Sequence, residues 1–192
     1  MDKVYLGIPC YGGTVGERTV GAVLQASARS LMFRVTTQSY SFLTHNFNIL
    51  FAMALNARKE GVTHFAMLHD DIEPEFFWLD KMMDIMNANG ADMLSAIVPI
   101  KTNVGMTSTA FDVGRGDLDP HWFVKRLTLH EAYEKYPPTF TDEKLLLNTG
   151  LMLIDIRKPW VEEVWFEFEN KIIKNDKGDF TCLAMSEDWS FS

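Results

Sequence analysis

A histidine and two aspartates end a short apolar run in the sequence THFAMLHDDIEP, residues 63–74. The apolar residues Phe65 to Leu68 are typical of a strand that is buried on both faces. The three polar side chains therefore follow the carboxyl end of a predicted strand, where ligands bind in open α/β sheets. If the backbone stays extended, His69 and Asp71 project to one side and Asp70 to the other. One side can then hold a metal ion, and the other can hold a sugar hydroxyl or order the loop.

The same acidic residues have a purely structural interpretation. Asp70, Asp71 and Glu73 precede a helix predicted at residues 75–89, with Pro74 suited to its first turn. Carboxylates are favoured near the start of a helix by the helix dipole. The local sequence supports the two interpretations equally.

A second polar turn follows the first predicted strand, Val4 to Ile8. The residues after it are Pro9, Cys10 and Tyr11, followed by a pair of glycines. Glycine lets the backbone approach a ligand closely, so a nucleotide could enter here, with Tyr11 as a stacking surface. The alternative is an ordinary turn between a strand and a helix with a surface tyrosine.

Hydrophobic spacing and breaker residues predict alternating helices and strands along the rest of the chain. Gly61 and Gly90 are expected to end the helices that precede them. Pro99 limits ladder hydrogen bonding near the end of its predicted strand. The predicted helices are 14–30, 45–59, 75–89, 128–136 and 160–173, and the further strands are 33–37, 92–100 and 145–156, the last interrupted by Asn148-Thr149-Gly150.

The composition is that of one domain with a substantial core, because the chain has 192 residues, of which 47% are hydrophobic. A net charge of -8 argues against nucleic-acid binding, which needs a clustered basic surface. No apolar stretch approaches the roughly 20 residues of a membrane-spanning helix, and no signal peptide is recognised. The two cysteines, Cys10 and Cys182, have no metal-binding spacing. We expect both to be reduced thiols of a cytoplasmic protein.

Four segments occur in a characteristic order: VYLGIPCYGG, HDDIEP, LNTGLMLID and SEDWSFS. Each motif is weak alone, but the ordered set covers nearly the whole chain. It resembles glycosyltransferases of the GT-A fold, and is similar to glycosyltransferase family 2 and its phage and bacterial relatives. The resemblance implies an α/β, Rossmann-like domain over residues 1–192, with a mostly parallel central sheet flanked by helices. Residues 1–100 would form the nucleotide-sugar-binding half, and 101–192 the acceptor-side half.

The resemblance implies that the chain moves a sugar from a nucleotide-diphosphate donor, such as a UDP-sugar, to an acceptor that the sequence does not identify. Asn46 has two expected roles, as a hydrogen-bonding group near the nucleotide or as a helix cap. Glycine inside the strand pattern at 145–156 indicates a bulge or close approach of a ligand. The expected nucleotide-sugar-binding residues are Pro9, Cys10, Tyr11, Asn46 and Asp70, and the residues expected to line the sugars are Asn148, Gly150 and Trp189.

Divalent-metal chemistry follows from the same resemblance. Asp71, with His69, would hold Mn²⁺ or Mg²⁺ against the diphosphate, and the imidazole favours Mn²⁺. Asp188 resembles the family's catalytic aspartate and would act as general base, with Glu187 in support. This assignment presumes inversion at the anomeric carbon. Trp189 would stack on the acceptor sugar or simply pack.

Two departures from the family pattern keep other functions open. His69 stands where the family has its first aspartate, and the segment QSYSFLTHN lacks the aspartate that reads the base. The alternatives are a nucleotidyltransferase of related fold and a non-catalytic module that binds sugar nucleotides. A nucleotidyltransferase would need a glycine-rich basic loop after the first strand, which residues 12–18 match only in part.

Residues 110–143 are expected to form a variable loop region that sets specificity, because charged residues, glycine and paired prolines replace the apolar runs. This region contains Asp117, Asp119, His121 and Trp122, which are candidate metal ligands or simply part of a solvated loop. Family members usually continue beyond the Glu-Asp motif with another helix, so the acceptor-side half is expected to be truncated at Ser192.

Overall fold

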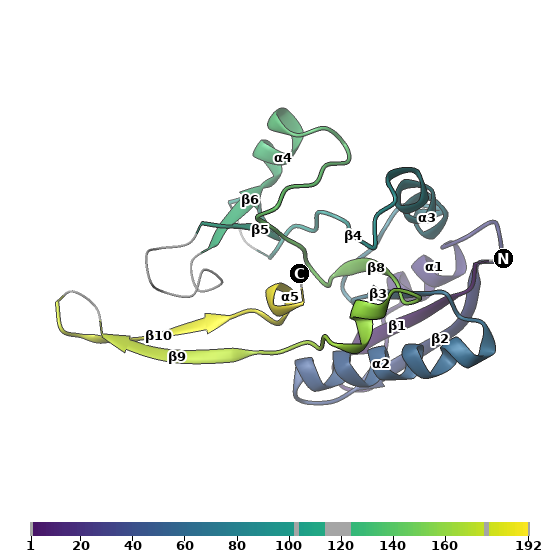
Figure 1. The fold of residues 1–192 in the computed structure, drawn as a ribbon, viewed down its shortest axis with the longest axis horizontal. Helices are drawn as coiled ribbons and strands as arrows, with labels where there is room; N and C mark the ends of the chain where they lie inside the picture. The colour runs from purple at the N-terminus through teal and green to yellow at the C-terminus, as the bar shows by residue number, and fades with distance from the viewer. Residues whose placement is uncertain (1, 102–103, 114–123, 175–176, 192) are drawn as a thin grey trace. The chain divides into compact units, whose positions relative to one another are not determined.

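The computed structural model describes residues 2–101, 104–113, 124–174 and 177–191. They form two compact units (Figure 1). Unit 1 comprises Met1–Ala96 and Thr149–Val164, and unit 2 comprises Ile97–Asn148 and Trp165–Ser192. The expected single domain over residues 1–192 stays a prediction. The cluster Asp117, Asp119, His121 and Trp122 lies outside the described residues.

Unit 1 is built on a five-stranded mixed sheet with strand order β2-β1-β3-β8-β4. Its strands are β1 (Val4–Cys10), β2 (Met32–Ser39), β3 (His64–Leu68), β4 (Met93–Ser95) and β8 (Leu151–Asp155). Strand β1 pairs in parallel with β2 and β3, whereas β8 runs antiparallel to both of its neighbours, β3 and β4. The predicted α/β class is confirmed. The sheet is mixed where a mostly parallel one was expected.

The three central strands explain why the sequence forms this sheet. Every residue of β1, β3 and β8 is buried, which agrees with their short apolar runs. Strand β4 covers only three residues of the predicted strand 92–100. Pro99 lies beyond it and makes an isolated bridge with Thr107.

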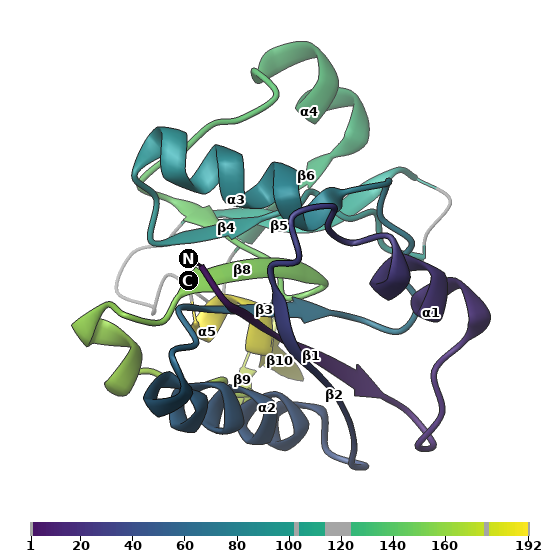
Figure 2. The ribbon, with the colours of Figure 1, turned by 90° about the vertical axis from the view of Figure 1, so that its right-hand side faces the viewer.

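Helices cover both faces of the unit 1 sheet (Figure 2). Helix α2 (Leu43–Ala57) lies along one face, where Phe47, Leu50 and Ala54 are wholly buried. Helix α3 (Trp78–Asn89) lies on the other face, close to α1 (Glu17–Leu24). The short 3-10 helices η1 (Arg58–Glu60) and η3 (Pro159–Glu162) complete unit 1.

The ends of these helices test the predicted boundaries. Gly61 and Gly90 both adopt the left-handed conformation and end η1 and α3, as predicted. Helix α1 is shorter than predicted. Helix α3 starts at Trp78 and not at residue 75, because Phe77 adopts φ 60° and its N–H donates to the carbonyl of Gln25. This contact with the end of α1 fixes the preceding loop in a non-helical path.

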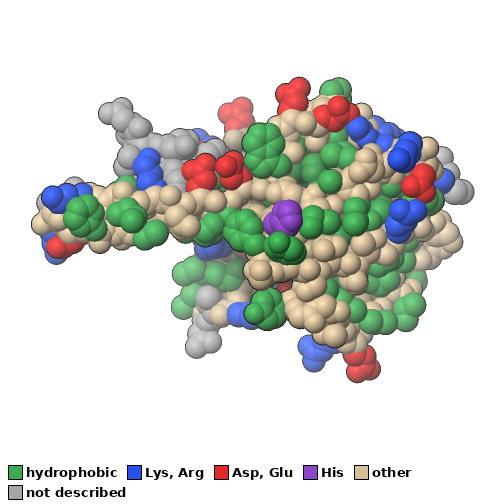
Figure 3. Space-filling model, turned by 90° about the horizontal axis from the view of Figure 1, so that it is seen from below, with side chains coloured by type: hydrophobic (Ala, Val, Ile, Leu, Met, Phe, Trp, Pro, Cys, Tyr) green, Lys and Arg blue, Asp and Glu red, His purple; other side chains and the backbone are tan. Residues whose placement is uncertain are grey.

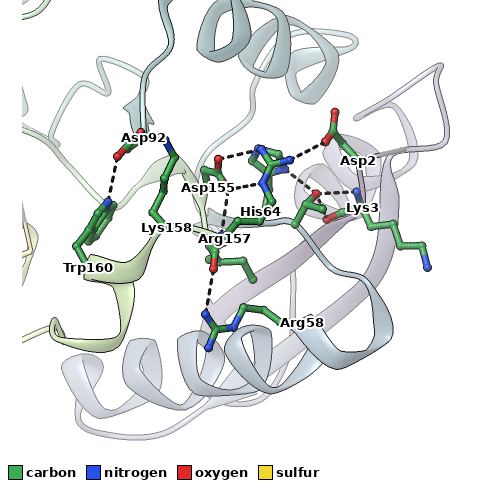
Figure 4. Close-up of polar contacts among 11 residues, drawn as sticks. Asp2, Lys3, Arg58, His64, Asp92, Asp155, Arg157, Lys158 and Trp160 are labelled. Atoms are coloured by element: carbon green, nitrogen blue, oxygen red, sulfur yellow. Dashed lines mark hydrogen bonds and ion pairs between the residues drawn. The ribbon is translucent and has the colours of Figure 1, made fainter.

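A polar network at the amino end of β3 fastens the returning segment 149–164 to unit 1 (Figure 4). The guanidinium of Arg157 donates to both carboxylate oxygens of Asp155, at 2.7 and 2.9 Å. Asp92 accepts from Lys158 at 2.6 Å and from the indole of Trp160 at 3.2 Å. The contacts of Asp92 tie this segment to a distant part of the sequence, whereas the pair of Arg157 and Asp155 lies within the segment itself.

Unit 2 contains a three-stranded sheet with strand order β6-β5-β7. Its strands are β5 (Met106–Asp112), β6 (Val124–Thr128) and β7 (Leu145–Leu146). Helix α4 (Leu129–Lys135) follows β6, with a capping box between Thr128 and Glu131. The predicted helix 128–136 is therefore found. Residues 110–143 were expected to form a variable loop region. Those that the structure describes contribute no strand to the five-stranded sheet of unit 1, but β6 and the end of β5 lie in this separate sheet.

The rest of unit 2 differs most from the sequence prediction. A helix was expected at 160–173, but the chain forms η3 and then an antiparallel hairpin of β9 (Glu169–Lys174) and β10 (Phe180–Met185). The short helix α5 (Glu187–Ser190) follows. Within the described residues of both units, no helix is long and apolar enough to cross a membrane.

Candidate functional site

The first and third strands of unit 1 end at one edge of the sheet, and β8 begins there. Cys10, the last residue of β1, is paired with Ser39, the last residue of β2. Leu68, the last residue of β3, is paired with Leu151, the first residue of β8. The backbone N–H of His69 then donates to the carbonyl of Gly150 at 2.9 Å. The HDDIEP and LNTG motifs are therefore brought together, because the strands β3 and β8 beside them are neighbours in the sheet.

His69 has a defined position at this edge. Its Nε2 atom lies 3.3 Å from the hydroxyl oxygen of Thr149, which is buried. Its ring centroid lies 5.1 Å from that of Phe47 on α2. The imidazole is thus held between a helix and the turn that leads into β8.

The two aspartates of the motif differ in exposure. The hydroxyl of Thr19 on α1 donates to the backbone carbonyl of Asp70 at 2.8 Å, which anchors the loop. Asp70 is half-buried, whereas Asp71 is exposed. Glu73 is also exposed and lies 3.6 Å from Arg18. Asp71 is therefore the carboxylate of the pair that solvent and a dissolved ligand can reach.

The residues predicted to hold a nucleotide begin at the end of β1. Cys10 is 4% exposed and Tyr11 is 86% exposed. Gly12 and Gly13 follow with φ +76° and +79°, and a Cβ at either would have no atom within 4 Å. Burial raises the pKa of the Cys10 thiol, and the negative charge of Asp70 raises this pKa further. The β1 turn and the aspartate motif are neighbours because they follow the paired parallel strands β1 and β3.

Asn46 lies inside α2, whose first residue is Leu43, so it is not the residue that caps this helix. Its amide nitrogen donates to the carbonyl of Gln38 at 2.8 Å, and its side chain is 1% exposed. Its Oδ1 atom is buried without a hydrogen-bond partner, as is the hydroxyl of Thr44. Unsatisfied buried polar atoms are costly and uncommon. The first turn of α2 therefore contains two buried polar atoms without a hydrogen-bond partner in the described structure.

The predicted donor set for a metal ion in unit 1 is one carboxylate, Asp71, and one imidazole, His69. The backbone turns there and is not extended, because the N–H of Ile72 donates to the carbonyl of His69 at 3.2 Å, so alternation along a strand does not place the two side chains on one side. Asp71 and His69 suit Mn²⁺ chemically, since both oxygen and nitrogen ligands are acceptable to it. No group of three or more His, Cys, Asp or Glu residues that could hold an ion is found in the described part of the chain. An ion at Asp71 would therefore need further oxygen ligands from a diphosphate or from water.

The remaining predicted residues lie in unit 2. Asn148 is 1% exposed, and its amide donates to the hydroxyl of Thr109 at 3.1 Å. Trp189 is 6% exposed, its indole donates to the carbonyl of Ser108 at 3.4 Å, and the Arg126 guanidinium lies 4.9 Å from its ring. Trp189 is therefore packed in unit 2, with little ring surface left for a sugar.

The two carboxylates of the SEDWSFS motif are both half-buried at the start of α5. Burial raises the pKa of Glu187, and the charge of Asp188 raises this pKa further. The Ser186 hydroxyl lies 3.5 Å from Glu187 and partly opposes this effect. Glu187 is thus the carboxyl that holds its proton to a higher pH than an ordinary glutamate.

Sequence reasoning did not single out three residues that position these groups: Thr149, Thr19 and Arg126. Thr149 belongs to the recognised LNTG motif, so its place beside the glycine could have marked it. Thr19 and Arg126 act through contacts between distant segments, and the sequence carries no signal for them. A separate cavity of about 360 Å³ in unit 1 contains none of the predicted site residues and is lined by Tyr5, Arg34, Met53, Asn56, Lys59 and Glu60, among others.

Comparison with known proteins gives no family assignment. No family model matches this chain, and no curated protein is significantly similar to it. The class that fold and site define is an α/β protein with a polar cluster at the carboxyl edge of its parallel strands.

Proposed function

We propose that this chain is a glycosyltransferase that takes a sugar from a nucleotide-diphosphate donor in the presence of Mn²⁺ or Mg²⁺. The observation that carries the proposal is the convergence at one sheet edge of unit 1. There the exposed Asp71 and the oriented His69 follow β3, and the glycine-rich turn after Tyr11 follows β1. Ligands of open α/β sheets bind at such an edge.

Each part of this edge suits a part of the donor. Asp71 with His69 would hold the divalent ion, which would offset the negative charge on the leaving diphosphate. Asp70 would accept a hydrogen bond from a sugar hydroxyl. Asn46 would accept a hydrogen bond from a donor group of the nucleotide through its Oδ1 atom, which has no protein partner, once the buried side chain moves to admit the ligand. Tyr11 is exposed enough to stack on a base.

The roles proposed for the acceptor-side residues rest on the sequence resemblance. Asp188 is proposed to accept the proton of the acceptor hydroxyl, and Glu187 to support it. Asn148 and Gly150, which are both buried in the structure, are proposed to lie beneath the sugars. Cys10 and Cys182 are free cysteines, which agrees with the proposed cytoplasmic location.

Calorimetry with UDP and GDP tests the proposal directly. Binding should be weak in EDTA and restored by Mn²⁺, because an acidic protein and an anionic diphosphate repel each other without a bridging cation. Release of the nucleotide from UDP- or GDP-sugars should be measured in parallel. Equal affinity in EDTA would remove the metal from the proposal, and metal-dependent binding without any turnover would favour a binding module.

A further inference from the structure

The hairpin of unit 2 is a two-stranded ribbon with most of its side chains exposed. Strands β9 and β10 pair only with each other within the part of the chain that the structure describes. Ile172 is 74% exposed and Phe180 is 76% exposed. A single two-stranded hairpin is at best marginally stable in water, and further strands or a covering element stabilise it. Among the described residues, no further strand pairs with this ribbon.

One face of the hairpin is largely apolar. The register places Cys182 opposite Ile172, Phe180 opposite Lys174 and Ala184 opposite Asn170. These side chains share a face because residues two apart along a strand point the same way. Hydrophobic side chains are accordingly visible along the surface of the hairpin in Figure 3. A strand added beside the hairpin would extend this apolar face.

The two edges of the hairpin differ in charge. Strand β9 carries Glu169, Lys171 and Lys174 among its six residues, whereas β10, FTCLAM, has no charged residue. Charged residues, lysine above all, are the usual protection of an exposed strand edge against pairing with another chain. The β9 edge is protected in this way, whereas the β10 edge has no charged residue and pairs with no other strand in the part of the chain that the structure describes.

We infer that a second copy of this chain pairs with the β10 edge, antiparallel and across a two-fold axis, to form a four-stranded sheet. The β10 sequence is self-complementary in this arrangement. With Cys182 opposite its own copy, Phe180 lies opposite Ala184 and Thr181 opposite Leu183, so large side chains meet small ones and no like charges oppose each other. The corresponding pairing through β9, centred on Lys171, would set Lys171 against Lys171.

The size of this interface predicts a weak dimer. A strand of six residues is only about 20 Å long, so the edge buries well under the roughly 800 Å² per partner of a standard interface. Association should therefore be reversible and concentration-dependent. Isologous pairing across a two-fold axis also closes the assembly at two copies.

Sedimentation equilibrium of the intact chain measures this association. Between about 1 μM and 1 mM, the range of weak protein association, the apparent mass should rise from 22.0 kDa toward twice that value. A chain that stays monomeric over this range, or one that grows without limit, would overturn the inference. In either case the β10 edge would instead bind a different partner or promote aggregation.

Lysine substitutions separate edge pairing from packing through the apolar face. Cys182→Lys puts like charges at the two-fold axis and should weaken association at least about tenfold. Ala184→Lys, which would meet Phe180 of the second copy, is a second test on the same strand. Ile172→Lys is the matched control, because it alters the same face from β9 and should leave the dimer intact. An equal loss of association in Ile172→Lys would show that the two copies pack through their apolar faces. That result would overturn the proposed pairing of the β10 edges.

A cross-link tests the register. Two Cys182 thiols in opposed positions should form a disulfide with diamide, which takes up the two electrons and two protons that the thiols release. Opposed positions in an antiparallel pair lie within the Cα distance that a disulfide spans. Cys182→Ser should associate normally without forming the covalent dimer. A fully associated wild type that gives no cross-link would contradict this register.

Discussion

The Nε2 atom of His69 lies 3.3 Å from the hydroxyl oxygen of Thr149, although 80 positions separate the two residues. The antiparallel pairing of β3 with β8 brings them together. Partners of a ligating histidine commonly fix the orientation of its ring, and their loss weakens metal binding. Thr149 therefore has a testable role if His69 binds a metal ion.

Thr149→Val removes the hydroxyl and nearly preserves the shape of the side chain. We expect Mn²⁺-dependent binding of UDP or GDP to weaken by about tenfold or more, because the imidazole loses the group that orients it. Calorimetry measures the change. Thr181→Val, on the exposed hairpin, is the control and should bind as the wild type does. Unchanged affinity in Thr149→Val would mean that the orientation of His69 does not matter for binding.

Asp71→Asn should weaken metal-dependent nucleotide binding far more than Glu73→Gln does. Asp71 is the exposed carboxylate directly after β3, whereas Glu73 lies further along the loop, beside Arg18. A neutral amide is a much poorer ligand than a carboxylate for Mn²⁺ or Mg²⁺. Titration of Mn²⁺ in the presence of UDP measures both variants. Equal effects would favour the structural interpretation, in which these acids only start a helix.

The sequence predicted the location of this edge better than its detailed contacts. HDDIEP and LNTG were recognised as polar interruptions of apolar runs, and they do meet through His69 and Gly150. The supporting contact from Thr19 on α1 depends on how a helix packs beside the loop. Periodicity predicts which face of a helix is buried, but not which hydroxyl will reach a distant carbonyl.

Phe77→Gly should stabilise the chain. Phe77 precedes α3 with φ 60°, a conformation that costs a residue with a side chain about 1–2 kcal/mol and glycine almost nothing. Its side chain is 46% exposed, so the loss of buried apolar surface is limited. We expect a rise in the free energy of unfolding of up to about 1 kcal/mol, measured by urea denaturation. Phe76→Gly is the control and should give no such gain.

The boundary at Phe77 also shows where sequence prediction stops. Gly61 and Gly90 were predicted correctly because a left-handed helix end favours glycine in any fold. The start of α3 and the loss of the helix expected at 160–173 depend on contacts with distant segments. The hairpin there forms because β10 supplies a partner for β9, and pairing between strands overrides a local helical pattern.

His64 should make the stability of the chain fall in mild acid. It is 1% exposed, and burial lowers its pKa, as does the charge of Arg157, while Asp155 and Asp2 oppose the change. The unfolded chain therefore takes up a proton at a higher pH than the folded chain. The contribution of His64 is fully present above about pH 6.5 and is lost as the pH falls below this value.

Melting temperatures at pH 7.5 and 5.5, which bracket the pKa of a histidine in an unfolded chain, measure this effect. The wild type should lose more stability between the two pH values than His64→Gln does. His64→Gln should be less stable overall, because it loses the contact of the imidazole with Thr63. His130→Gln is the control, since His130 is exposed, and it should keep the wild-type dependence on pH. If the melting temperature of His64→Gln falls as much between the two pH values as that of the wild type, the acid sensitivity comes from other groups.

Asp188→Asn tests the proposed general base, because the amide keeps the size of the side chain but cannot accept the proton. Sugar transfer, or donor hydrolysis by water where no acceptor is at hand, should fall by about 100-fold or more. Donor affinity and melting temperature should stay nearly unchanged. A carboxylate that only supports α5 would instead give a lower melting temperature with almost full activity.

Glu187→Gln is the matched variant, since the two carboxylates are adjacent and both half-buried. If Glu187 only supports Asp188, its loss should cost much less activity. The charge of Asp188 helps to raise the pKa of Glu187, so Asp188→Asn should lower that pKa. If Glu187 were the base instead, the acid limb of the pH–rate profile would shift to lower pH in Asp188→Asn while transfer continued. Such a profile would reassign the proton-accepting role from Asp188 to Glu187.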